Sequence, residues 1–325
     1  MSSELLLSPV ENSNPFNADK PDNPRRGIIF YLLSGACVCV NLLSSKILYE
    51  RNAELNGGIL LVFRGALSSV LLGAFHNSNL KYVMYDSIEP SCAKPLAVRV
   101  VSGNFAIFAV FMATKYFSLT ASVMVLNCAP LVSFCLAGPV LGEKVTVQQI
   151  AFLILAFGGL SLMILGGTDK ETRPQYIPTL AVYIVFFFQP FALSAGTLAM
   201  RAARKLNEDV VACYMAFSLF IVFYPICVMS GQKLEIWHDF DFIDFGLLLQ
   251  ISIGTITSQT LRFKALQNYT VSGLQPYNFA QPLQMFLTDM LLFNKNFTMP
   301  QIGGLMLLIV LYGSQFLAYI LKKNS

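Results

Sequence analysis

Two arginines interrupt apolar segments of this chain, and their guanidinium groups could do chemistry there. Arg64 lies in the run ILLVFRGALSSVLL, and Arg99 follows Lys94 and Pro95 at the start of another apolar run. A charge at the bilayer centre costs at least about 2.5–3.5 kcal/mol, so it should face the interior of a helical bundle. There it could bind a phosphate or carboxylate. The alternatives are that Arg64 satisfies backbone carbonyls and that Arg99 reaches the membrane surface.

A second group of polar side chains falls between residues 270 and 292, around two prolines. The group consists of Gln275, Pro276, Tyr277, Asn278, Gln281 and Pro282. A proline inside a helix frees a backbone carbonyl, which must then be satisfied by protein or water. We predict that the two prolines kink this segment and that the polar side chains line a substrate cavity. Hydrogen bonding between helices is the alternative use of such residues.

The same pattern occurs earlier in the chain. Residues 119–150 resemble residues 271–302 at an offset of 152, with small or hydroxyl residues first and a proline, Pro130 or Pro282, in mid-helix. Asn127 precedes the first of these prolines, so Asn127 and Pro130 join the cavity and kink candidates. Kinked polar helices at equivalent places in two halves indicate a binding site near the membrane midplane.

Three further polar residues complete the candidates. Gln259 and Arg262 lie at the end of the apolar segment 243–263 and could bind substrate at the mouth of a cavity. Asp289 is an acid within the segment 270–292 and could couple transport to protons or neutralise Arg64. A position at the membrane interface is the alternative for Asp289.

The elements that must position these residues are apolar stretches of membrane-spanning length, since a spanning helix needs about 20 residues. They cover residues 27–47, 58–76, 96–114, 119–139, 147–167, 175–198, 209–230, 243–263, 270–292 and 299–321. These ten stretches fall into two sets of five. Because five is an odd number, the second set must cross the membrane in the opposite sense to the first. We therefore predict an all-α integral membrane protein with ten transmembrane helices in two inverted five-helix repeats. The expected divisions are a disordered cytosolic N-terminus 1–26, repeats 27–168 and 169–321, and a cytosolic tail 322–325.

Composition excludes several classes of function. The chain of 325 residues is 55% hydrophobic and 12% charged, whereas soluble domains are about 25% charged. The net charge of +4 is dispersed, without the basic stripe that nucleic acid requires. The seven cysteines lack metal-ligand spacing, and only two histidines are present. We expect no enzyme activity, no metal, no cofactor and no nucleic-acid partner.

Lysine and arginine are almost twice as frequent in the connections on one predicted side as on the other. The positive side faces the cytoplasm, so both termini are expected in the cytosol. The ending Lys322-Lys323-Asn324-Ser325 resembles a dilysine retrieval signal. The expected location is therefore an endomembrane, such as the ER or Golgi, or the plasma membrane.

Several short motifs carry a family resemblance. They are Phe63-Arg64, Pro130, Leu141-Gly142-Glu143-Lys144, Gln149 and Gly158-Gly159. With these motifs the chain resembles the drug/metabolite transporter superfamily, in its EamA-type, solute carrier family 35-like branch, over about residues 27–322. The second half departs from the pattern, because Phe293-Asn294-Lys295 stands where Leu-Gly-Glu would be.

This resemblance implies a ten-helix transporter whose central cavity is lined mainly by the first, third, fourth, sixth, eighth and ninth helices, with a homodimer as an option. We predict a secondary transporter that moves a small polar anionic metabolite across the bilayer by alternating access. A nucleotide-sugar antiporter of the ER or Golgi is one alternative, although the FYNN-like and GALNK-like motifs of that type are absent. A non-transporting membrane scaffold or complex subunit is the other.

Overall fold

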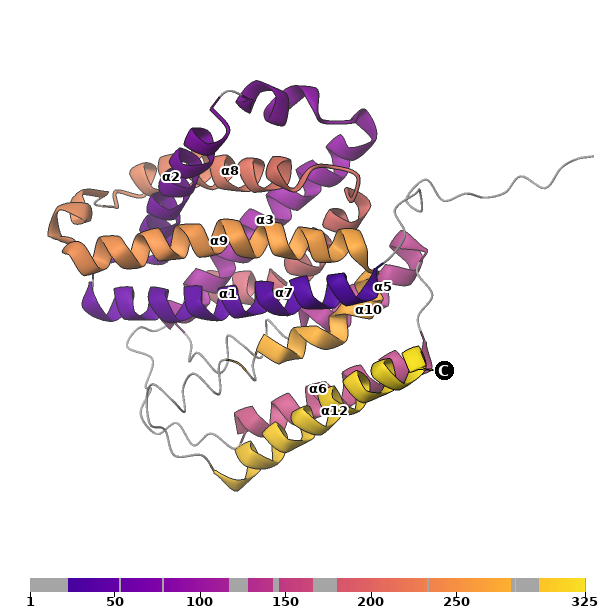
Figure 1. The fold of residues 1–325 in the computed structure, drawn as a ribbon. Helices are drawn as coiled ribbons and strands as arrows, with labels where there is room; N and C mark the ends of the chain where they lie inside the picture. Colours follow the sequence, from indigo (N-terminus) through magenta and orange to yellow (C-terminus); the bar gives the residue numbers. More distant parts are fainter. Residues whose placement is uncertain are drawn as a thin grey trace, which may run out of the picture.

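The computed structural model describes residues 23–52, 54–77, 79–116, 128–142, 146–165, 180–232, 234–281, 284 and 298–324. Within these ranges every regular element is helical (Figure 1). The elements are α1 (Pro24–Arg51), α2 (Gly57–Phe75), the π-helix η2 (Tyr82–Asp86), α3 (Pro90–Tyr116), α5 (Ala129–Leu141), α6 (Val147–Leu165), α7 (Leu180–Ala202), α8 (Glu208–Met229), the 3₁₀ helix η3 (Leu234–Asp239), α9 (Phe242–Asn268), α10 (Val271–Leu274), the 3₁₀ helix η4 (Gln275–Phe279) and α12 (Met299–Asn324).

Five of these helices are long and apolar enough to cross a bilayer. They contain the stretches Pro24–Arg51, Gly57–Phe75, Pro90–Met112, Val182–Ala202 and Glu208–Met229. Shorter apolar stretches occur at Ile150–Gly159 and Met299–Leu311. The described part of the chain therefore supports an all-helical membrane protein with several spans, whereas ten spans remain an expectation.

Some helix boundaries differ from the sequence expectation. Helix α3 begins at Pro90 rather than near residue 96, because proline is well suited to the first helical position. Pro130 lies in the first turn of α5, and residues 117–127 before it lie outside the described ranges, so the expected kink stays a prediction. The segment expected at 270–292 starts as two short pieces, since α10 gives way to the 3₁₀ helix η4 at Gln275.

Asparagine and aspartate side chains fix where four helices begin. Asn23, Asn56 and Asn207 each accept a hydrogen bond from a backbone N–H in the first turn of α1, α2 and α8. Asp241 and Asp244 form a reciprocal capping box at the start of α9. Such caps satisfy N–H groups that have no partner within the helix.

The long helices pack in antiparallel pairs that join the two halves of the chain. Helices α1 and α9 lie side by side (Figure 1). At one end of this pair the backbone N–H of Asn23 donates to the carbonyl of Asn268 at 2.7 Å. At the other end Arg51 contacts both Asp241 and Asp244, with 2.7 Å between Arg51 Nε and Asp244 Oδ1. The remaining pairs are α2 with α8, α3 with α7, and α6 with α12.

Two apolar clusters divide this bundle into layers. The Phe263 cluster includes Leu96, Val210, Met215, Phe263, Leu266 and Leu274. The Ile251 cluster includes Leu48, Leu60, Phe111, Leu219, Phe223 and Ile251. Between them lies a set of buried and half-buried polar residues that we name the polar layer: Arg64, Ser68, Arg99, Asn104, Ser252, Thr255, Ser258, Gln259 and Arg262. The helices therefore hold charged groups between two apolar zones.

Close contact between α2 and α8 depends on a glycine. A Cβ atom on Gly65 would lie 2.8 Å from the backbone nitrogen of Phe220, whereas a Cβ on Gly73 of the same helix would meet nothing within 4 Å. Lipid chains are as apolar as leucine, so helices in a membrane associate through such packing rather than through the hydrophobic effect.

We expect Gly65→Ala to lower the free energy of unfolding by about 1–3 kcal/mol, because the two backbones must move apart. Gly73→Ala is the matched control and should be neutral or slightly stabilising, since alanine favours the helix. Melting temperatures of both purified variants in the same detergent measure the difference. Equal shifts would contradict the packing described for α2 and α8.

Candidate functional site

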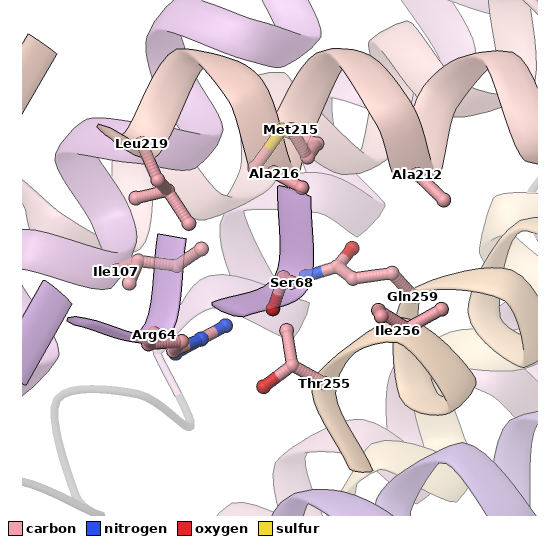
Figure 2. A pocket seen from close by; sticks show the side chains of 10 residues that line it. All are labelled: Arg64, Ser68, Ile107, Ala212, Met215, Ala216, Leu219, Thr255, Ile256 and Gln259. Atoms are coloured by element: carbon pink, nitrogen blue, oxygen red, sulfur yellow. The ribbon is translucent and has the colours of Figure 1, made fainter. Parts of the chain in front are cut away.

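A small cavity opens within the polar layer, between α2, α3, α8 and α9. Its lining consists of Arg64, Ser68, Ile107, Ala212, Met215, Ala216, Leu219, Thr255, Ile256 and Gln259. Figure 2 shows the α8 side chains along one side and the three α9 side chains opposite. The cavity volume is about 20 Å³, room for about one water molecule. This volume is too small for a metabolite.

Arg64 supplies the positive charge of the cavity. Its guanidinium group points into the space between Ser68 and Thr255 (Figure 2), and the residue is only 7% exposed. The ring of Phe111 lies 5.6 Å from the guanidinium carbon, a cation–π contact. No hydrogen-bond partner reaches Arg64 Nε, Ser68 Oγ or the hydroxyl of Tyr49 in the described structure. These donors are available to an anion.

Arg99 lies beside the cavity and is held by Gln259. The guanidinium Nη2 of Arg99 donates to Oε1 of Gln259, which connects α3 to α9. Arg99 is 4% exposed, and its Nε has no partner. Glycine makes room for this charge: a Cβ on Gly196 of α7 would lie 2.8 Å from Arg99 Nη1.

A third arginine follows one turn farther along α9. Arg262 Nη2 donates to the hydroxyl oxygen of Tyr31 at 3.3 Å, and the guanidinium carbon lies 5.5 Å from the ring centroid of Tyr31. The Tyr31 hydroxyl in turn donates to Oδ1 of Asn278 at 3.1 Å. Arg262 is close enough to Arg99 for the two charges to repel. Residues from α1, α3, α9 and η4 thus surround a region of positive potential.

No carboxylate neutralises these three arginines within the described residues. The described acids that pair with cations lie at helix ends, where Asp241 and Asp244 contact Arg51 and Glu208 contacts Lys264 at 3.0 Å. Burial in a medium of low dielectric makes an unneutralised charge costly. The charge of these three arginines is therefore not cancelled by any carboxylate of the described residues.

The other expected site residues fall into two groups. Gln275 is buried at the start of η4, Tyr277 packs against the Phe263 cluster, and the Gln281 side chain lies against Gly35 of α1. Pro276 follows Gln275 in the first turn of η4. Asn127, Pro282 and Asp289 lie outside the described residues.

The lining helices differ from those that the family resemblance implied. The third and eighth predicted helices, α3 and α9, contribute as expected, but the second and seventh, α2 and α8, also line the cavity. Sequence reasoning missed the α8 residues Ala212, Met215, Ala216 and Leu219. Their three- and four-residue spacing defines one helix face, but the same apolar spacing describes a face that packs against lipid. Nothing in the sequence separates these two uses.

Tyr31 and Tyr49 were also missed by sequence reasoning. Both lie on α1 in apolar surroundings, and only the fold brings their hydroxyl groups near Arg262 and Arg64. An aromatic residue in a membrane helix usually indicates an interface anchor, so the sequence pattern alone pointed elsewhere.

Comparison with known proteins agrees with this geometry. A solved crystal structure, described only as that of a protein, superposes on 90% of this chain and on 98% of its own length, with a TM-score of 0.69 and 12% sequence identity. Identity this low shows a shared fold alone. No curated protein sequence matches the chain.

The sequence also matches the model of the EamA-like transporter family over residues 25–165, the stretch that runs from α1 to the end of α6. Residues 25–165 therefore form an EamA-like transporter family domain, and the apolar helices indicate a multi-pass integral membrane protein.

Proposed function

We propose that this transporter carries a small polar anion, with Arg64, Arg99 and Arg262 as its binding charges. The observation that carries the proposal is that Arg64 and Arg99 are buried and Arg262 is half-buried, without a carboxylate partner among the described residues. Arg64 is also aimed into the cavity, with free donors of Ser68 and Tyr49 nearby. Phosphates and carboxylates are the anions whose geometry a guanidinium fork fits.

Transport would proceed by alternating access of two inverted five-helix repeats. The helix pairing supports this idea. If each helix of the first half is matched with its counterpart in the second half, α1 corresponds to α7 and α3 corresponds to α9. The α1–α9 pair is then equivalent to the α7–α3 pair. The α2–α8 and α6–α12 pairs map onto themselves under the same exchange. Pairing of this kind is expected from a pseudo-two-fold axis in the membrane plane.

The closed cavity fits one step of such a cycle. A volume of about 20 Å³ admits no metabolite, and an apolar cluster covers the polar layer on each side. A substrate could enter only if the helices separate on one side of the layer, while the cluster on the other side stays packed.

In our proposal both termini face the cytosol, the bilayer surrounds the helices in an endomembrane or the plasma membrane, and a homodimer is a further option.

Loss of the two innermost arginines should abolish transport. We expect Arg64→Ala with Arg99→Ala to lower anion flux into proteoliposomes at least about tenfold, since each hydrogen bond to a charged group contributes about 1.5–3 kcal/mol. Labelled succinate and labelled phosphate serve as probes. Arg64→Lys should be intermediate, because lysine keeps the charge but loses the planar fork.

Arg26→Ala is the control for this variant, since Arg26 is exposed at the start of α1. It should transport at the wild-type rate. Undiminished flux through the double variant would contradict the anionic substrate.

Anions should also stabilise the purified protein. A ligand that binds only the folded state adds about 2.7 kcal/mol at a hundred times its Kd, which raises the melting temperature. We expect shifts with phosphates, dicarboxylates or nucleotide derivatives and none with glucose or choline. The Arg64→Ala, Arg99→Ala variant should lose the response. Stabilisation by the cations or neutral solutes alone would contradict the proposal.

The same screen separates the alternatives. A shift that requires a nucleotide sugar, together with uptake stimulated by the corresponding nucleoside monophosphate inside the vesicles, would favour the antiporter. A folded protein that responds to no solute and always co-purifies with one partner would favour a scaffold.

A further inference from the structure

Gln259 holds an unusual position among the residues of the polar layer. Its side chain lines the same cavity as Arg64, while its carboxamide oxygen accepts a hydrogen bond from Arg99. It therefore connects the cavity to a buried charge that has no other described side-chain acceptor. The bond also crosses from α3 to α9, which belong to different halves of the chain.

The partners of these arginines are neutral. Arg99 donates to an amide, and Arg262 donates to a phenol that donates onward to the amide oxygen of Asn278. A neutral oxygen satisfies a guanidinium donor but does not cancel its charge. An anionic oxygen makes a shorter bond of roughly twice the strength. An arriving anion can therefore displace the carboxamide of Gln259 from Arg99. A carboxylate side chain at position 259 would instead compete with the anion for Arg99.

We propose that Gln259 takes the place of the substrate on Arg99 when the carrier is empty. The inference rests on the proposed anionic substrate and adds how the empty site closes. A buried donor that loses its acceptor is costly, so an empty cavity lined by free guanidinium groups would resist closure. With Gln259 on Arg99, one donor of this buried guanidinium keeps an acceptor from the protein itself. Gln259 is then a positioning residue for the return of the empty carrier.

This assignment has a kinetic consequence. Net uptake into empty vesicles requires the unloaded carrier to return, whereas exchange across the membrane cycles only the loaded carrier. Removal of the Gln259 acceptor should therefore slow net uptake and spare exchange. It should also lower the half-saturating anion concentration, because Arg99 no longer has a competing partner.

The test compares Gln259→Met with the wild type in proteoliposomes, with labelled succinate and labelled phosphate as probes. One set of vesicles is empty, and the other is preloaded with the same unlabelled anion. We expect net uptake to fall about tenfold, the ratio that corresponds to about 1.4 kcal/mol, while exchange stays within about twofold. Gln250→Met is the matched control, since Gln250 lies on α9 but pairs with Asn41 at 3.2 Å.

A second variant guards against a folding defect. Gln259→Glu keeps the size of the side chain and places a carboxylate on Arg99, so we expect both fluxes to fall while the melting temperature is maintained. Parallel loss of net uptake and exchange in Gln259→Met, or no change in either, would overturn the role of Gln259. A wild-type protein that moves neither probe and that no anion stabilises would instead refute the anionic substrate, and the role of Gln259 with it.

Discussion

The placement of three guanidinium groups between two apolar clusters is the constraint on which the rest of the structure depends, and Arg64 and Arg99 are buried while Arg262 is half-buried. Arg64, Arg99 and Arg262 come from three different helices, and a medium of low dielectric opposes their burial. Neutral oxygens and aromatic faces offset only part of that cost. Among the described residues the three charges therefore lack a carboxylate partner, which is the basis for the proposed anionic substrate.

The helix packing makes this incomplete site possible. Glycines at 65 and 196 allow backbone and guanidinium to approach where a Cβ would collide. The α1–α9 pair is fastened at both ends, by the Asn23 to Asn268 hydrogen bond and by Arg51 with its two aspartates. Acidic residues thus stabilise the ends of helices, where water screens them, and the described acids leave the arginines of the middle layer unpaired.

The sequence predicted that the arginines face the interior of the bundle, but it did not predict the residues that surround them. Arg64 and Arg99 were found because a charge within an apolar run is costly in lipid and must therefore face the interior of the bundle. The α8 face was missed because Ala212 and Ala216 have the same apolar character whether they line a cavity or contact lipid. The start of α3 was placed near residue 96 rather than at Pro90, because local sequence does not determine such a boundary.

The chemistry of the neutral partners says why a transporter would leave arginines without acids. A carboxylate on Arg99 would bind it tightly and exclude a substrate anion from the same donors. An amide or phenol holds the guanidinium in position, yet yields to a charged oxygen. Gln259 and Tyr31 both fit this requirement, and each joins helices that are distant in sequence. In the proposed cycle, weak internal partners would let the same arginines serve both the unloaded carrier and the anion-bound carrier.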